Sequence, residues 1–297
     1  MSTFAELTDS TLLYLSGFSN MQDQSTYLTA GVDAATLTLP IADASAVSRG
    51  LVEIDDELIQ VDNVNTTGLL LTAPPYGRGF RGTTAASHSS GARVVSAPML
   101  PRKMVKNAIN ETIRSLFPDL YGVDSTTFTF INGQRTYPLP AGAQSAVQVQ
   151  WQMSGYATEW EPVRRYWVDG NADTTVFPTG VSIDIKDFVV PGRSVHVVYT
   201  KEPTELSSNT DVFTTVTGLP ASCEDLVRLG AAYRMIGFLD TPHLSGYSAE
   251  ADFSSNMRPA GGAANLSKWM LQQYQIRLQQ EQNKLSSFYP VRVRYTF

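Results

Sequence analysis

The chain has 297 residues, of which 42% are hydrophobic and 17% are charged, and its formal net charge is -6. This composition predicts a folded protein and excludes a long disordered polyelectrolyte. The acidic balance argues against a nonspecific nucleic-acid coat, although it is compatible with a weakly repulsive surface along which DNA slides.

The first part of the chain alternates between helical and strand patterns. Residues Thr3–Phe18 begin with a capping-box pattern and predict a short helix. From 35 to 97, apolar residues recur at every second position between turn signals, which predicts short strands in a small β module. Pro101 then begins a helix that we expect to end at Phe117, because Pro118 cannot continue it.

The second part repeats this alternation over longer elements. Residues 125–200 predict strands, and within them Val147–Met153 alternates apolar residues with glutamine, so that one face is buried. Helices are expected at Pro220–Phe238 and at Asn265–Ser287. The loop between them, 240–264, is long and rich in proline and glycine, which is typical of a contact segment.

We therefore predict an α+β fold in which a four-helix bundle core carries two inserted antiparallel β modules and an extended C-terminal tail. The predicted ranges are 1–34, 98–124 and 201–289 for the bundle, 35–97 for the small β module, 125–200 for a β-sandwich-like domain and 290–297 for the tail. Apolar residues at helical spacing form the predicted bundle core. They are Val105, Ile109, Ile113, Leu116, Leu226, Leu229, Tyr233, Ile236, Leu266, Trp269, Met270 and Ile276.

The C-terminal tail is the sharpest candidate for a binding site. Its residues are Val291, Arg292, Val293, Arg294, Tyr295, Thr296 and Phe297. Apolar and basic side chains alternate along it, so an extended strand would place them on opposite sides. Such a strand can pair its backbone with the sheet edge of a partner. The same alternation fits an ordinary last strand folded back on the chain's own β domain.

Two further motifs have structural explanations beside their functional ones. Gly77–Gly82 mixes arginine with an aromatic residue, as some single-strand nucleic-acid binders do, but a glycine-rich turn explains the same residues. The acidic run Glu53–Glu57 lacks the spacing and the glycine of a calcium loop. We expect it to form a solvated strand edge, and we predict no metal site.

The sequence offers little for catalysis. Nucleophilic chemistry would require Cys223 or a serine beside one of the three histidines, which are His88, His196 and His243. There is no G-x-S-x-G motif, and a single cysteine forms no internal disulfide. We predict no enzymatic activity, no catalytic residue and no cofactor. No apolar run approaches the roughly 20 residues of a membrane span, so we expect a soluble protein with no membrane partner.

Three stretches of the chain carry a family resemblance. They are the helix Leu100–Phe117, the β region from Val147-Gln148-Val149-Gln150-Trp151 to Val195-His196-Val197-Val198-Tyr199, and the helix Asp225–Met235. In their order and pattern they resemble the tailed-phage head-to-tail connector (adaptor) proteins. In addition, Gly79–His88 together with Gly91 resembles a short pattern scattered among phage tail and neck proteins.

The resemblance implies a structural protein of the virion neck, assembled in the host cytoplasm. Its subunits would form a homo-oligomeric ring of twelve beneath the portal protein, with a tail completion or tail tube protein docked below. DNA would pass through the lumen without sequence recognition, and the tail 291–297 would dock on the portal. One alternative is a tail, baseplate or fibre-associated structural protein whose 35–97 module binds a partner or a host surface. The other alternative is an unrecognised hydrolase.

Overall fold

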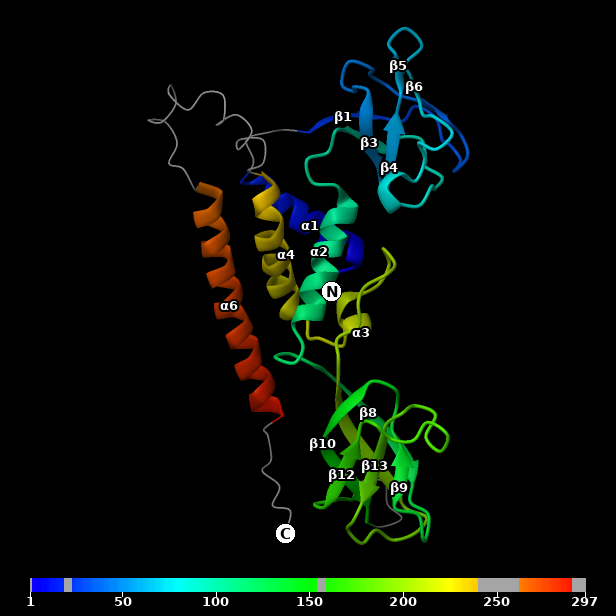
Figure 1. The fold of residues 1–297 in the computed structure, drawn as a ribbon. Coiled ribbons are helices and arrows are strands. Elements are labelled where there is room, and N and C mark those ends of the chain that lie inside the picture. Colours follow the sequence, from blue (N-terminus) through cyan, green and yellow to red (C-terminus); the bar gives the residue numbers. More distant parts are fainter. Residues whose placement is uncertain (1, 19–22, 154–158, 240–261, 290–297) are drawn as a thin grey trace. The chain divides into compact units, whose positions relative to one another are not determined.

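A computed structural model describes residues 2–18, 23–153, 159–239 and 262–289 of the chain. These residues form five α-helices, one 3₁₀ turn and fourteen strands (Figure 1). The chain divides into two compact units. Unit 1 comprises Met1–Phe4, Asn110–Val227 and Tyr274–Phe297, and unit 2 comprises Ala5–Ile109 and Arg228–Gln273.

The strands of unit 2 form two antiparallel sheets, which we call the β module. The first sheet has the order β1 (Gln24–Tyr27), β7 (Arg93–Ser96), β3 (Gly50–Ile54), β4 (Glu57–Val61), and the second has the order β2 (Thr38–Pro40), β6 (Leu70–Thr72), β5 (Asn63–Asn65). Their alternating apolar residues, such as Leu39, Ile54 and Ile59, are fully buried in one core. Strand β1 lies before the alternating pattern that begins at Ala35, and it pairs with β7 along its whole length.

The strands of unit 1 also form two antiparallel sheets, which we call the β domain. One has the order β11 (Trp160–Pro162), β10 (Ala143–Gln152), β14 (Ser194–Lys201), β8 (Gly122–Thr129), and the other has the order β12 (Tyr166–Asp169), β13 (Ser182–Ile185), β9 (Thr136–Pro138). Val149 and Trp151 are buried, as the alternation predicts. Val147 is half-buried, because the register of β10 shifts at a bulge between Ala146 and Gln148.

The prediction of a four-helix bundle core is wrong. The described residues contain five helices and four antiparallel sheets. The helices are α1 (Phe4–Ser16), α2 (Arg102–Ser115), α3 (Phe213–Thr217), α4 (Cys223–Leu239) and α6 (Gly262–Phe288). The residues of α2, α4 and α6 are shared between the two units, each of which also contains two sheets. Helical spacing identifies an apolar face, but it does not say whether a helix or a sheet covers that face.

Helix α3 was not predicted, because five residues are too few to show a helical period. Its conformation is set by contacts within unit 1. Phe213 is fully buried, and its N–H donates to the carbonyl oxygen of Ser2 at 3.0 Å. Gly218 ends the helix with a φ of 72°, in the left-handed region that favours glycine. In the described part of the chain, no helix is long and apolar enough to cross a membrane.

Candidate functional site

The most densely bonded side chains of the β module surround Glu57, at the start of β4. Glu57 is 1% exposed, and its Oε1 accepts hydrogen bonds from Arg78 Nε and from the Gly79 N–H, both at 2.8 Å. Its Oε2 accepts from Arg78 Nη2 at 2.9 Å and from the Ala86 N–H at 3.0 Å. The other guanidinium hydrogens donate to three backbone carbonyl oxygens. All five N–H donors of Arg78 are therefore used.

His88 completes this network. Its Nε2 lies 2.9 Å from Glu57 Oε2, and its Nδ1 lies 2.8 Å from Asp55 Oδ2. Because each ring nitrogen faces a carboxylate oxygen, the geometry favours the imidazolium, which donates from both nitrogens. The hydrogen bond to Asp55 raises the pKa of His88 more than burial lowers it, and the bond to Glu57 raises it further. Two cations thus balance two carboxylates in the network.

The ionisation of Glu57 follows from the same contacts. Burial by itself would raise the pKa of this carboxyl group. The hydrogen bonds from Arg78, Ala86, Gly79 and His88 together outweigh burial and lower the pKa of Glu57 to about 2. The carboxylate is therefore ionised at neutral pH, and its partners offset the cost of burying the charge.

The glycines of Gly77–Gly82 allow the backbone to reach this network. A Cβ atom on Gly77 would lie 2.6 Å from the carbonyl oxygen of Gln60, so β4 approaches too closely for any side chain. Gly79 has a φ of 61°, which glycine adopts at little cost. The Arg78 side chain is 5% exposed and fully paired. The motif is therefore a turn that buries its first arginine, and it does not offer that arginine to a nucleic acid.

A second charged cluster joins the β3–β4 hairpin to α2 within unit 2. Glu53 is 6% exposed, and its Oε1 accepts a hydrogen bond of 2.7 Å from the N–H of Arg102, the first residue of α2. Asp56 pairs with Arg102 at 3.1 Å and with Lys106 at 2.7 Å. Arg102 also pairs with Asp9 of α1. Glu53 thus satisfies one of the helix's free N–H donors, and the ion pairs hold the hairpin against α2.

The pKa of Glu53 is raised by its surroundings in this cluster. Burial is the main cause, and the hydrogen bond and the charge of Arg102 offset it only in part, so the pKa rises from 4.5 to about 7. Because the pKa of Glu53 is higher in the folded than in the unfolded state, its contribution to stability is fully present below pH 4.5. This contribution is lost as the pH rises through 7. Ionising this buried carboxyl costs the folded state on the order of 3 kcal/mol.

Replacing Glu53 with glutamine is expected to stabilise unit 2 at pH 8 by about 2–3 kcal/mol. Glutamine keeps an oxygen for the Arg102 N–H and cannot ionise. Hydrogen exchange of peptides from β3 and α2 at pH 5 and pH 8 measures the effect, because slower exchange reports a higher opening free energy. The gain should be smaller at pH 5 than at pH 8, and it should disappear well below pH 4.5, where Glu53 is protonated in both the folded and the unfolded state. An equal gain at all pH values would show that ionisation of Glu53 is not the cause.

In unit 1, a buried carboxylate connects α6 to the start of α4. Glu281 is 2% exposed, accepts a hydrogen bond of 2.6 Å from Ser222 Oγ, and pairs with Lys284 at 2.7 Å and with Arg277 at 3.2 Å. Cys223 lies beside it and is buried. Burial, followed by the charge of Glu281, raises the pKa of the Cys223 thiol to about 12. Cys223 is therefore a protonated core residue, which makes it a poor nucleophile.

The residues predicted for the bundle core differ in exposure. Those that are buried are Val105, Ile109, Ile113, Leu116, Leu226, Ile236 and Met270. Leu229, Tyr233 and Leu266 are half-buried. Trp269 and Ile276 are 47% and 46% exposed in the isolated chain. The predicted docking tail 291–297, the loop 240–261 and His243 lie outside the described residues.

The network of Glu57, Arg78 and His88 was not predicted from the sequence. The prediction that Glu53–Glu57 forms a solvated edge is wrong for Glu53 and Glu57, since both are buried. One signal was available. Glu53 lies within the apolar run Leu51–Ile54, and Glu57 directly precedes the apolar run Leu58–Val61. A carboxylate buried beside such a strand needs a compensating partner. The resemblance of Gly79–His88 to a phage pattern also marked the segment that supplies the partners.

The charged side chains of these clusters are occupied in ion pairs and hydrogen bonds with one another. Residues 92–278, more than half of the chain, match a family model described as SU10 adaptor protein. The chain belongs to the SU10 adaptor protein family, which confirms its resemblance to phage head-to-tail adaptors. It is a phage structural protein, a component of the virion neck that associates with other virion proteins.

Three further observations accompany the family match. A search of curated proteins finds no significant match. The matched residues begin at 92, so the part of the β module before that residue lies outside the family model. Across the described ranges, no group of three or more His, Cys, Asp or Glu residues is placed to hold a metal ion.

Proposed function

We propose that the chain forms a homo-oligomeric ring of twelve between the portal protein and the tail, with DNA passing through the lumen. The match of residues 92–278 to the adaptor family carries this proposal. The net charge of -6 supports it, because a lumen that does not attract phosphates lets DNA slide without sequence recognition. Assembly takes place on the portal in the host cytoplasm, and a tail completion or tail tube protein docks below.

In this proposal, the tail 291–297 docks on the portal by adding a strand to one of its sheet edges. Val291, Val293, Tyr295 and Phe297 fill pockets, while Arg292 and Arg294 face the other side. The two β regions, 35–97 and 125–200, act as separate domains that provide further surfaces. Their separate cores of buried side chains support this division.

Deleting residues 291–297 is expected to leave the chain folded and to abolish its binding to portal rings. The matched control replaces Arg292 and Arg294 with glutamine, which keeps the apolar side and the backbone pairing. Mixing each purified protein with its cognate portal, followed by electron microscopy, measures the number of subunits that join the ring. If the deleted protein still binds every site of the portal ring, the tail does not dock on the portal. If the undeleted protein forms a ring with a number of subunits other than twelve, the proposed stoichiometry is wrong.

A further inference from the structure

One end of the β domain carries a group of loops that no part of the proposed function uses. Strands β8 and β14 pair from Gly122 and Lys201, where the chain enters and leaves the β domain, to Thr129 and Ser194. The loops 130–135 and 186–193 follow and precede these strands at the far end. Eight-residue strands place that end about 25 Å from the chain connections. Together with residues 163–165, we call these segments the distal loops.

The distal loops are held together by backbone hydrogen bonds. The Phe130 N–H donates to the Arg193 carbonyl at 2.8 Å, and the Lys186 N–H donates to the Arg165 carbonyl at 2.9 Å. Similarly, the N–H of Ile185, at the end of β13, donates to the carbonyl of residue 135 at 2.9 Å. Each loop is therefore about one strand spacing from the next, which brings the three segments and their side chains close together.

A single carboxylate fixes the third segment. Asp187 Oδ2 accepts the N–H groups of Arg164 and Arg165 at 2.6 and 2.9 Å, and Oδ1 accepts from Arg165 Nε at 2.8 Å. Burial would raise the pKa of Asp187, but these bonds and the Arg165 charge together lower it. The one acid of the distal loops is thus ionised and already occupied by their own backbone and side chain.

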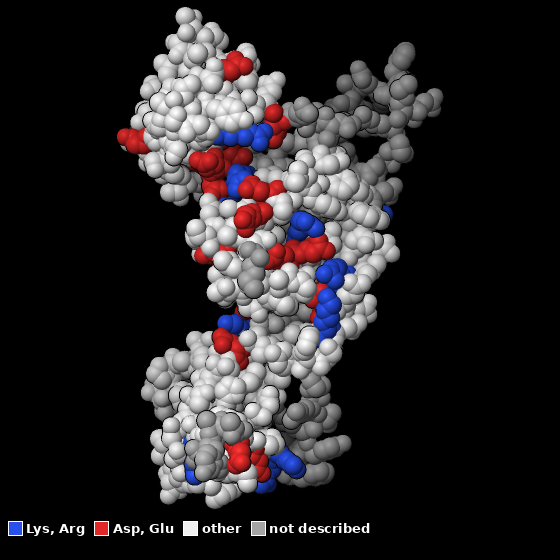
Figure 2. Space-filling view, turned by 180° about the vertical axis from the view of Figure 1, so that it is seen from behind, with Lys and Arg blue, Asp and Glu red and all other residues white. Residues whose placement is uncertain are grey.

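The distal loops are strongly basic. They contain Arg135, Arg164, Arg165, Lys186 and Arg193 beside Asp187, a net charge of +4 on a chain whose total is -6. All these cations are exposed except Arg193, which is half-buried. Among the described residues, Arg165 alone of the five forms an ion pair. Figure 2 shows lysine and arginine side chains at this lower end of the β domain, beside a smaller group of acidic atoms. The nearest acids along the chain are Glu161 on β11 and Asp184 on β13, each two residues from a distal loop.

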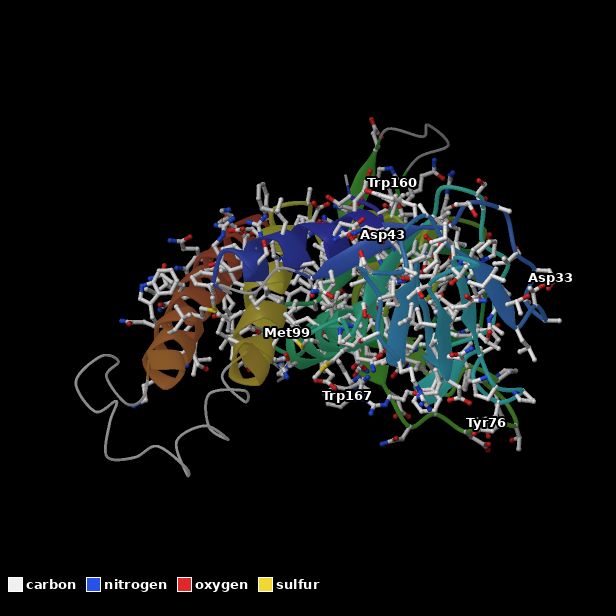
Figure 3. All side chains as sticks on the ribbon, turned by 90° about the horizontal axis from the view of Figure 1, so that it is seen from above. Asp33, Asp43, Tyr76, Met99, Trp160 and Trp167 are labelled. Carbon is white, nitrogen blue, oxygen red and sulfur yellow. The ribbon has the colours of Figure 1, made fainter. Side chains whose placement is uncertain are left out.

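Large apolar side chains accompany these cations. Phe188 is 81% exposed and Ile131 is 54% exposed, on two loops that the Phe130–Arg193 hydrogen bond holds together. Trp167, which is 62% exposed, lies on β12 two residues beyond Arg165. In Figure 3, Trp160 and Trp167 lie on different sides of the β domain. Exposed aromatic residues with four arginines and one lysine match the composition of protein interfaces, which are rich in aromatics and arginine and poor in lysine.

We propose that the distal loops dock an acidic surface of another protein of the particle. Phe188 enters an apolar pocket of that partner, and Arg164, Lys186 and Arg193 pair with carboxylates around it. The exposed Phe188 indicates that the partner is a protein and not duplex DNA, because the phosphate backbone of DNA offers no apolar pocket. This proposal goes beyond portal docking, because it concerns a different surface and a different partner chemistry.

The test places the photo-cross-linking residue p-benzoyl-phenylalanine at position 188 of the full chain, in particles assembled in infected cells. Mass spectrometry of the adducts is expected to identify a peptide of another virion protein that is rich in aspartate and glutamate. Adding Arg164→Glu and Lys186→Glu should reduce the yield of the adduct by at least about tenfold, because the reversed charges repel the acidic partner. The matched control, Arg49→Glu with Arg93→Glu, makes the same change at two exposed positions of the β module and should leave the adduct intact.

Several results would overturn the proposal. They are an adduct with DNA, an adduct only between copies of this chain, no adduct in complete particles, or an adduct that survives the charge reversal. Melting curves show whether the reversed variant folds, and if it does not, Arg164→Gln with Lys186→Gln takes its place. Deletion of residues 291–297 should stop portal binding in purified mixtures regardless of these outcomes, so the two proposals fail separately.

Discussion

Replacing Glu57 with glutamine is expected to lower the free energy of unfolding of the β module by about 3–5 kcal/mol. The change leaves the buried Arg78 guanidinium and the His88 imidazolium without their shared carboxylate. The glutamine amide also turns a hydrogen-bond donor toward groups that are donors themselves, namely Arg78, His88 and the backbone N–H of Ala86. A buried charge without a partner costs far more than the loss of one neutral hydrogen bond.

Hydrogen exchange of peptides from β3, β4 and β7 is the appropriate measurement for this variant. All four tryptophans lie outside the β module, so tryptophan fluorescence does not report its unfolding. The matched control is Asp55→Asn, which removes the other carboxylate that contacts His88. Since the Asp55 side chain is 61% exposed, water replaces its contact, and we expect a loss of about 1 kcal/mol or less.

A double-mutant cycle separates the ion pair from simple loss of packing. Glu57→Leu combined with Arg78→Met removes both charges, so the pair should be less destabilised than the two single changes added together. Additive effects would show that the two side chains act independently. A loss of less than about 1 kcal/mol in Glu57→Gln would also contradict the role assigned to the network.

The same network contributes fully to the stability of the β module only within a limited pH range. The pKa of Glu57 is lowered to about 2, so its contribution is present above pH 4.5 and is lost as the pH falls through 2. The pKa of His88 is raised, so its contribution is present below pH 6.5 and is lost as the pH rises through the folded-state pKa. Both contributions are complete between pH 4.5 and 6.5.

Replacing Phe213 with alanine is expected to lower the free energy of unfolding of unit 1 by about 3–5 kcal/mol. The ring is fully buried, and α3 is too short to persist without the packing of this side chain. The backbone around it also holds the N-terminal residues, since Thr3 forms a β-bridge with Val212 and the Phe4 N–H donates to the Asp211 carbonyl at 2.9 Å. Faster hydrogen exchange should therefore appear both in peptides of α3 and at the N-terminus.

Phe188→Ala is the matched control for Phe213→Ala. It removes the same atoms from the same unit at a position that is 81% exposed, so the free energy of unfolding should change by no more than about 0.5 kcal/mol. Equal losses in the two variants would show that burial of the Phe213 ring is not what stabilises this part of unit 1.

The periodicity of apolar residues predicted the long helices of the chain but not its shortest elements. Apolar residues at steps of three and four predicted α2, α4 and α6, whose observed ends fall within a few residues of the expected ones. Such a pattern is local, so it is readable without the rest of the fold. The five-residue helix α3 and the four-residue strand β1 are too short to establish a period, and both were missed. Both depend on partners that are distant along the chain.

By itself, the sequence determined where the long helices and many of the strands lie and to which class of protein the chain belongs. Both can be predicted from residues that are close together in the chain, as in α2, which directly follows Pro101. Only the tertiary structure decided what those elements pack against, which is why the predicted bundle core was wrong. It also decided that Glu57 meets Arg78 and His88, which are 21 and 31 residues away. Burial of a charge depends on all elements that surround it, and no single segment specifies them.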